Sequence, residues 1–200
     1  MGLIIGEPNT APGNSPMPTL PSTKGSVVWI TGLAGSGKTS IAKELVRLFD
    51  QRGRKALLLD GEAVRGAVND PQIGYDRDSR LTQAMRTSRL ARLMADQGFT
   101  VVVATMSLFN EVFGWNRANL PSYFEVYLQV SLDVLKERDA HGLYSGAASG
   151  TTENVVGIHL DFDKPTSPDL VLVNDEYAAD VTSFSQQILS CVAETNVMRG

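Results

Sequence analysis

The stretch Gly32-Leu33-Ala34-Gly35-Ser36-Gly37-Lys38-Thr39 decides the fold of this chain. It fills every fixed position of the pattern G-x-x-x-x-G-K-[ST], follows the apolar run at residues 27–30 and precedes a helical pattern at residues 40–52. The glycines let the backbone turn its N–H groups inward, so the loop and the following helix N-terminus form a nest for phosphate oxygens. The stretch therefore predicts a P-loop, because a plain glycine-rich turn needs neither the lysine nor the adjacent hydroxyl.

This motif assigns roles to individual residues. Lys38 is expected to contact the β- and γ-phosphates of ATP as a catalytic residue, and the Thr39 hydroxyl to ligate Mg²⁺. Asp60 and Glu62 follow a buried strand pattern at 55–59, where carboxylates can serve Mg²⁺ or a substrate hydroxyl, so Asp60 is a second candidate metal ligand. The predicted ATP-binding residues of the loop are Gly32, Leu33, Ala34, Gly35, Ser36, Gly37, Lys38, Thr39 and Ser40.

Composition indicates one soluble α/β domain. The chain has 200 residues, 42% of them hydrophobic and 20% charged, with a formal net charge of −4. This acidic balance argues against nucleic-acid binding, and no stretch is long and apolar enough to span a membrane. The single cysteine, Cys191, favours a reducing, cytoplasmic compartment. Residues 1–24 are rich in Pro, Gly, Ser and Thr and are predicted to be a flexible tail before a P-loop kinase domain at residues 25–200.

Strand and helix patterns alternate along the domain. Apolar, β-branched runs without polar alternation are typical of parallel strands that are covered on both faces. A three-layer αβα sandwich of the P-loop nucleotide kinase type, with a parallel five-stranded sheet, is therefore expected. Residues 140–168 carry little regular pattern and are predicted to form a lid. After the first strand and helix, further strands are expected at 55–59, 100–104, 124–129 and 170–173, and further helices at 63–70, 78–97, within 109–119, 131–139 and 178–198.

Several short motifs occur together in a characteristic order. The P-loop is followed by Leu-Asp-Gly-Glu-Ala-Val-Arg from Leu59, by Gly74-Tyr75 with Arg80, by Glu137-Arg138-Asp139, by Gly142-Leu143-Tyr144 and by Ser-Pro-Asp-Leu-Val-Leu from Ser167. With these motifs, residues 26–175 resemble the adenylylsulfate (APS) kinase family of P-loop kinases, which transfers the γ-phosphoryl group of ATP to the ribose 3′-hydroxyl of adenosine 5′-phosphosulfate. The resemblance implies ATP and Mg²⁺ as cofactors, a small nucleotide acceptor and, by analogy with family members, a homodimer.

The resemblance also assigns the acceptor-binding residues. It places Glu62 at the position of the family's catalytic acid, usually Asp, which orients or deprotonates the 3′-hydroxyl. Arg65 and Arg80 match arginines that hold the acceptor, which suits a guanidinium fork, and Arg138 matches a residue near the ATP. The full set of acceptor-binding residues that the resemblance implies is Glu62, Arg65, Tyr75, Arg80, Gln83, Ser107, Val155 and Ile158.

The acceptor pocket departs from the family pattern. Val155 replaces the lid aromatic that stacks on the APS adenine, Gln83 replaces an asparagine, and Met85 and Ser145 replace basic residues. Two acceptors therefore stay open, APS itself and another nucleotide such as a cytidine diphosphate derivative, beside a third possibility of a non-catalytic nucleotide-binding protein. His141 and His159 lie in the lid without a partner cluster, so no metal site is expected there.

Overall fold

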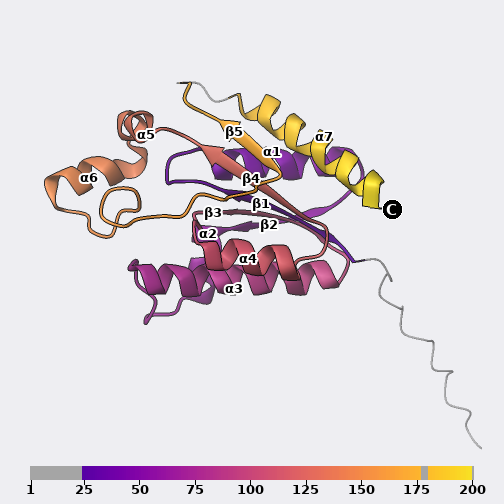
Figure 1. The fold of residues 1–200 in the computed structure, drawn as a ribbon, viewed down its shortest axis with the longest axis horizontal. Coiled ribbons are helices and arrows are strands. Elements are labelled where there is room, and N and C mark those ends of the chain that lie inside the picture. The colour runs from indigo at the N-terminus through magenta and orange to yellow at the C-terminus, as the bar shows by residue number, and fades with distance from the viewer. Residues whose placement is uncertain (1–23, 177–179, 200) are drawn as a thin grey trace, which may run out of the picture.

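The computed structural model describes residues 24–176 and 180–199 (Figure 1). The predicted tail at residues 1–24 lies outside this range except for Lys24, so its flexibility stays a prediction. Within the described residues, no helix is both long and apolar enough to cross a membrane.

The centre of the molecule is a parallel sheet. Its five strands lie in the order β2-β3-β1-β4-β5, so the P-loop strand β1 is central, with β3 on one side and β4 on the other. Because the P-loop follows the central strand, it emerges in the middle of the carboxyl edge of the sheet, where such folds bind ligands. This confirms the predicted parallel five-stranded sheet. The strands are β1 (Ser26–Thr31), β2 (Ala56–Asp60), β3 (Thr100–Thr105), β4 (Tyr123–Gln129) and β5 (Leu170–Val173).

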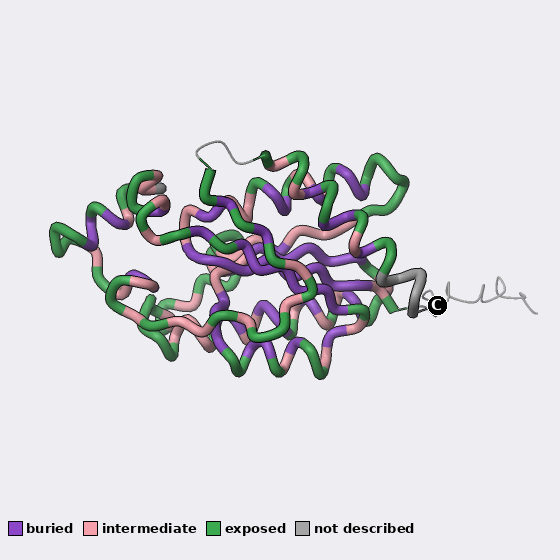
Figure 2. Tube along the Cα trace, turned by 45° about the horizontal axis from the view of Figure 1, so that its top comes forward, coloured by how far each residue is buried: buried purple, intermediate pink, exposed green. Residues whose placement is uncertain are grey.

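Helices cover both faces of the sheet and give the predicted three layers (Figure 1). Successive residues of a strand point to opposite faces. Val28 and Ile30 of β1 accordingly pack with α1 (Lys38–Gln51) and α7 (Val181–Arg199). Val27 and Trp29 pack against α3 (Arg77–Asp96) and α4 (Asn110–Asn119) on the other face. Buried positions accordingly follow the sheet and the inner sides of these helices (Figure 2).

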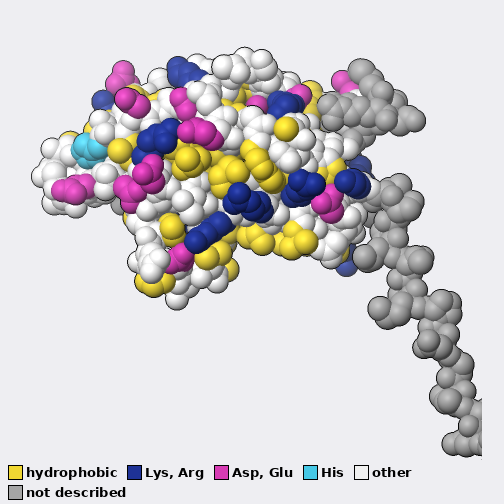
Figure 3. Space-filling model, turned by 60° about the horizontal axis from the view of Figure 1, so that its bottom comes forward, with side chains coloured by type: hydrophobic (Ala, Val, Ile, Leu, Met, Phe, Trp, Pro, Cys, Tyr) yellow, Lys and Arg dark blue, Asp and Glu magenta, His cyan; other side chains and the backbone are white. Residues whose placement is uncertain are grey.

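The outer face of α3 and α4 mixes basic, acidic and apolar side chains (Figure 3). Ion pairs join Arg77 to Glu111 and Arg86 to Asp70 there. These pairs offset part of the basic charge of α3, and an exposed pair such as Arg77–Glu111 contributes only about 0–1 kcal/mol to stability.

One short helix begins two residues earlier than the sequence predicts. Helix α2 spans Gly61–Val68, because the Asp60 carboxylate caps it by accepting hydrogen bonds from the backbone N–H groups of Glu62 and Ala63 at 3.1 and 3.3 Å. Asn69 then ends the helix in a left-handed conformation. The cap fixes Asp60 at the point where strand β2 becomes helix.

The predicted lid, residues 140–168, contains more regular structure than the sequence indicated. After α5 (Leu132–Arg138), a 3₁₀ turn (Ala140–Gly142) leads into helix α6 (Leu143–Ser149). The helix forms because the Asp139 carboxylate accepts hydrogen bonds from the Tyr144 and Ser145 N–H groups, and because the Tyr144 ring is buried in a separate apolar cluster with Leu33. The lid therefore packs into an apolar cluster, here called the lid core, that it shares with Leu33 of the P-loop, Tyr127 of β4 and Leu135 of α5.

Candidate active site

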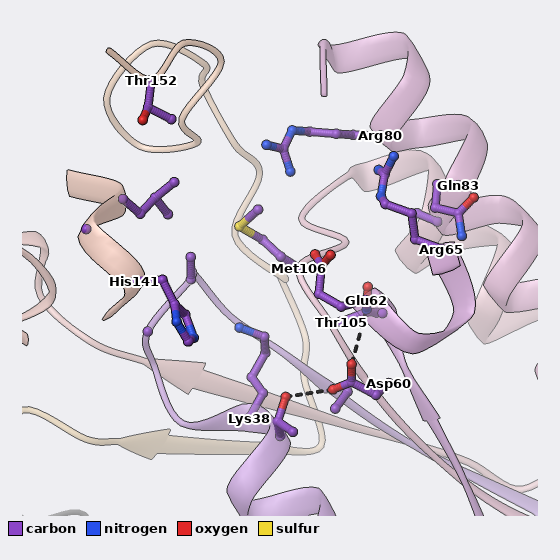
Figure 4. A pocket seen from close by; sticks show the side chains of 18 residues that line it. Lys38, Asp60, Glu62, Arg65, Arg80, Gln83, Thr105, Met106, His141 and Thr152 are labelled. Atoms are coloured by element: carbon purple, nitrogen blue, oxygen red, sulfur yellow. Dashed lines mark hydrogen bonds between the residues drawn. The ribbon is translucent and has the colours of Figure 1, made fainter. Parts of the chain in front are cut away.

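A cavity of about 730 Å³ opens at the carboxyl ends of the central strands. Its walls come from five parts of the chain: the P-loop with the start of α1, the β2–α2 junction, helix α3, the end of β3 with Met106, and the lid (Figure 4). Nucleotide-sized ligands bind in such clefts at the carboxyl edge of parallel sheets. The side chains that line this cavity therefore define the candidate site.

Lys38 supplies the buried positive charge of the P-loop. Its Nζ donates hydrogen bonds to the Leu33 carbonyl at 2.7 Å and to the Ser36 hydroxyl at 3.3 Å, and both acceptors are neutral. Burial lowers the pKa of Lys38 from 10.5 to about 8, against the smaller opposing effect of the Asp60 charge. An anion that enters the loop would therefore stabilise the charged amine, because a cation that is held away from water gains most from a counter-charge.

Two residues outside the P-loop hold its backbone in place. The Asn174 Nδ2 donates to the Ser36 carbonyl at 2.8 Å, and the Tyr144 hydroxyl donates to the Ala34 carbonyl at 2.9 Å. The loop is also closely packed, since a Cβ at Gly32 would lie 2.4 Å from the Leu128 carbonyl oxygen. A pre-formed nest of this kind does not need to be ordered when phosphate binds.

Thr39 and Asp60 meet at the base of the cavity. The Thr39 Oγ1 donates to the Asp60 Oδ2 at 2.7 Å, while the Asp60 Oδ1 caps α2 (Figure 4). Among the described residues, no group of three or more His, Cys, Asp or Glu side chains could hold a metal. A hydroxyl and a carboxylate on neighbouring elements fit Mg²⁺, which keeps several waters and takes oxygen ligands from substrate phosphates.

Two arginines form the opposite end of the cavity. The Arg65 and Arg80 guanidinium groups lie 4.5 and 5.2 Å from the centroid of the Tyr75 ring. Arg80 donates from Nε to the Tyr75 carbonyl and from Nη2 to the Asn154 carbonyl at 3.0 Å, which ties α3 to the lid. Burial, together with the positive charge of Arg65, lowers the pKa of Arg80. Two adjacent cations at a cavity wall form a site for an anionic group.

Comparison with known proteins identifies the family. The profile of the family described as adenylylsulphate kinase matches residues 24–173. The chain belongs to the adenylylsulphate kinase family. It is therefore a phosphotransferase of the nucleotide kinase type, as the motif order predicted.

Named relatives within this family act on different substrates. The chain is 38% identical over 148 residues to the cytidine diphosphoramidate kinase of Campylobacter jejuni, and this match covers 74% of the chain and 85% of the relative. It is 37% identical over 160 residues to the adenylyl-sulfate kinase of Chloroflexus aurantiacus, and this match covers 80% of the chain and 86% of the relative. Among solved structures, the APS kinase CysC of Mycobacterium tuberculosis in complex with AMPPNP and APS has a TM-score of 0.78 and 31% identity, and the match covers 86% of this chain and 99% of that one.

Four of the eight acceptor-binding residues that the resemblance implies line the cavity: Glu62, Arg65, Arg80 and Gln83. Glu62 projects from the first turn of α2, and Gln83 lies deeper on α3 with a side chain that is 7% exposed. The Gln83 Nε2 has no hydrogen-bond partner among the described residues. Of the predicted ATP-binding loop, Ala34, Gly35, Lys38 and Thr39 line the cavity, Gly32, Leu33, Ser36 and Gly37 lie behind them, and Ser40 is exposed outside it.

Five predicted site residues outside the P-loop do not line the cavity. Tyr75 is exposed, and its ring packs against the Arg65 and Arg80 guanidinium groups. The Ser107 hydroxyl is buried and accepts a hydrogen bond from the Trp29 Nε1 at 3.1 Å, because its side chain points into the core. Val155 is 2% exposed inside the lid core, and Ile158 lies on the lid surface. Arg138 instead donates to the backbone carbonyls of Asn174 and Glu176, so its contact with ATP stays a prediction.

The structure adds one residue that sequence reasoning set aside. His141 lines the cavity from the lid, together with Leu143 and Thr152 (Figure 4). A signal was available in its position directly before Gly142-Leu143-Tyr144, one of the motifs that carry the family resemblance. Sequence reasoning set His141 aside because it lacks a partner cluster for a metal, but a histidine that binds no metal can still contact a substrate.

Proposed function

We propose that this enzyme transfers the γ-phosphoryl group of ATP to the ribose 3′-hydroxyl of a nucleotide, with adenosine 5′-phosphosulfate as the acceptor. The observation that carries this proposal is the order of groups along one cavity: Glu62 lies between Lys38 at one end and the Arg65–Arg80 pair at the other (Figure 4). Phosphoryl transfer between two anionic substrates needs a cation at each end and a carboxylate at the reacting hydroxyl between them.

The loop amides and Lys38 bind the β- and γ-phosphates, and Arg65 and Arg80 hold the anionic part of the acceptor. Mg²⁺, held by Thr39 and Asp60, would neutralise charge on the phosphate oxygens. Glu62 orients the 3′-hydroxyl and accepts its proton as the new O3′–P bond forms and the bond between phosphorus and the β,γ-bridging oxygen breaks, which releases ADP. Positioning and charge account for most of the catalysis in such reactions.

The lid keeps water from the transferred group. It is tied to the P-loop through the Tyr144 hydroxyl and to the acceptor side through the hydrogen bond from Arg80 to the Asn154 carbonyl. These contacts at the two ends of the cavity support a lid that excludes water from the reacting centre and so prevents hydrolysis of ATP.

A second candidate acceptor is a cytidine diphosphate derivative. It is favoured by Val155, which is buried and gives this lid position no aromatic ring to stack on a base, and by the unpartnered Gln83 Nε2 on the cavity wall. A lost stacking ring weakens the binding of a base by about 1–3 kcal/mol. The relative from Campylobacter jejuni that is 38% identical to this chain is named a cytidine diphosphoramidate kinase, which supports this second candidate.

The test is a kinase assay with MgATP and a panel of acceptors that includes APS, adenosine diphosphate derivatives and cytidine diphosphate derivatives. We expect ADP formation that depends on the acceptor and is lost in Lys38→Ala, while circular dichroism shows an unchanged fold. Preference for a cytidine derivative over APS would select the second candidate. Tight ATP binding without turnover on any acceptor would overturn the proposal and favour a non-catalytic protein.

A further inference from the structure

The turn that carries His141 is held in an unusual backbone conformation. His141 has φ 62° and ψ 23°, and it lies between Asp139 at φ 34° and Gly142 at φ 66°. The left-handed region costs a non-glycine residue about 1–2 kcal/mol, and such strain persists only where the surroundings impose it. A glycine would adopt this conformation without that cost. The backbone conformation of the turn therefore does not account for a histidine at position 141.

The surroundings that impose the turn are visible. The Asp139 Oδ1 accepts hydrogen bonds from the N–H groups of Tyr144 at 2.7 Å and Ser145 at 3.2 Å, on the far side of His141. Tyr144 is itself fixed by its hydroxyl to the Ala34 carbonyl of the P-loop. The chain before and after His141 is thus anchored, and the anchor is the phosphate-binding loop.

The imidazole that this turn presents is available to a ligand. His141 lines the cavity, and in Figure 4 its ring lies on the same side as the Lys38 amine and away from Arg65 and Gln83. The His141 side chain is exposed, and neither ring nitrogen has a hydrogen-bond partner among the described residues. The other lid histidine differs on both points, because the His159 Nδ1 accepts a hydrogen bond from the Val155 N–H at 3.2 Å and His159 does not line the cavity.

We propose that His141 is a catalytic residue that donates an imidazole N–H to an oxygen of the γ-phosphoryl group during transfer. The proposal rests on the proposed phosphoryl transfer and adds a donor from the lid to the P-loop donors. Negative charge spreads over the three equatorial oxygens of the phosphoryl group in the transition state, and the P-loop approaches them from one side only. A pre-positioned donor from the lid stabilises this charge without moving during the reaction.

The substitution His141→Gly tests the role of the imidazole without disturbing the backbone of the turn. His141→Gly removes the imidazole and relieves the left-handed strain, so its melting temperature should equal or exceed that of the wild type. Loss of one hydrogen bond to a charged group should lower kcat by about 10- to 100-fold. KM for ATP should change little, because the contact strengthens in the transition state rather than in the bound substrate.

Two further variants serve as controls. His141→Asn tolerates the left-handed conformation and presents an amide N–H, so it should recover part of the lost kcat. His159→Ala alters a lid histidine outside the cavity and should keep the wild-type kcat.

The kinetics distinguish the two proposals. A wild-type kcat in His141→Gly, or a rise in KM for ATP without a fall in kcat, would overturn the role of His141 while leaving the kinase function intact. A wild-type enzyme that fails to phosphorylate every acceptor would instead overturn the proposed function itself.

Discussion

Replacement of Asp60 separates a structural from a catalytic contribution, because its two carboxylate oxygens have different partners. The Oδ1 caps helix α2, and the Oδ2 accepts the Thr39 hydroxyl hydrogen at 2.7 Å. Asp60→Ala removes both contacts. Asp60→Asn keeps the shape and a capping oxygen, but it loses the negative charge that we assign to Mg²⁺ binding.

The magnitudes differ accordingly. Loss of an N-cap costs about 0.5–2 kcal/mol, which for a domain of this size lowers the melting temperature by about 2–4 °C for each kcal/mol. Asparagine is as good an N-cap as aspartate, so the free energy of unfolding of Asp60→Asn should lie within about 0.5 kcal/mol of the wild-type value. The Mg²⁺ concentration that gives half-maximal activity should rise by about 10- to 100-fold in Asp60→Asn, because the loss of a group that binds or orients a metal usually has this effect.

The assay measures initial rates against free Mg²⁺ at fixed ATP, with thermal unfolding of each variant alongside. Asp180→Asn is the matched control, since the Asp180 Oδ1 accepts a hydrogen bond from the Ser183 N–H near the start of α7, outside the cavity. An Asp60→Asn enzyme with wild-type Mg²⁺ dependence would refute the metal assignment. Equal losses of melting temperature in Asp60→Ala and Asp60→Asn would refute the capping argument.

Three other perturbations test separate parts of the cavity. Because burial lowers the pKa of Lys38 to about 8, the amine loses its charge above that pH, and kcat/KM for ATP should fall as the pH rises through about 8. The value of kcat should stay level over this range, because bound phosphates raise the pKa of Lys38. A kcat/KM that does not change with pH would contradict this. Arg80→Ala should raise KM for the acceptor by about 10- to 100-fold with KM for ATP unchanged, because it removes a charged hydrogen-bond donor; equal effects on both substrates would place Arg80 elsewhere. Val155→Phe should not restore base stacking, because this side chain is 2% exposed in the lid core, and overpacking should cost about 1–3 kcal/mol in thermal unfolding; an unchanged melting temperature with tighter APS binding would show that the ring reaches the cavity.

The sequence predicted the features that depend on residue type and spacing. The P-loop needs glycines, a lysine and a hydroxyl at fixed intervals after a strand, and the continuous apolar runs of β1 and β3 are typical of parallel strands covered on both faces. Both requirements are local, so the sheet and the phosphate nest followed from the sequence.

Tertiary contacts decided the rest. Helix α6 has a glycine and two serines in seven residues and forms because Asp139 and Tyr144 anchor it, which no local pattern predicts. Matching of motifs assigned Ser107 and Val155 to the acceptor site from their positions along the chain, but it could not show that both side chains are buried away from the cavity. His141 reaches the cavity through a left-handed backbone, a conformation that only a few per cent of non-glycine residues adopt and that residue type alone does not predict.

The position of the transferred phosphoryl group in the product tests the central claim most directly. With wild-type enzyme, MgATP and the preferred acceptor, ³¹P NMR should show a new phosphomonoester coupled to the ribose H3′ proton, and a 3′-deoxy analogue of that acceptor should bind without turnover. A product phosphorylated at the 2′-hydroxyl or on the acceptor's terminal phosphate, or release of inorganic phosphate alone, would contradict the placement of the 3′-hydroxyl between Lys38 and the Arg65–Arg80 pair.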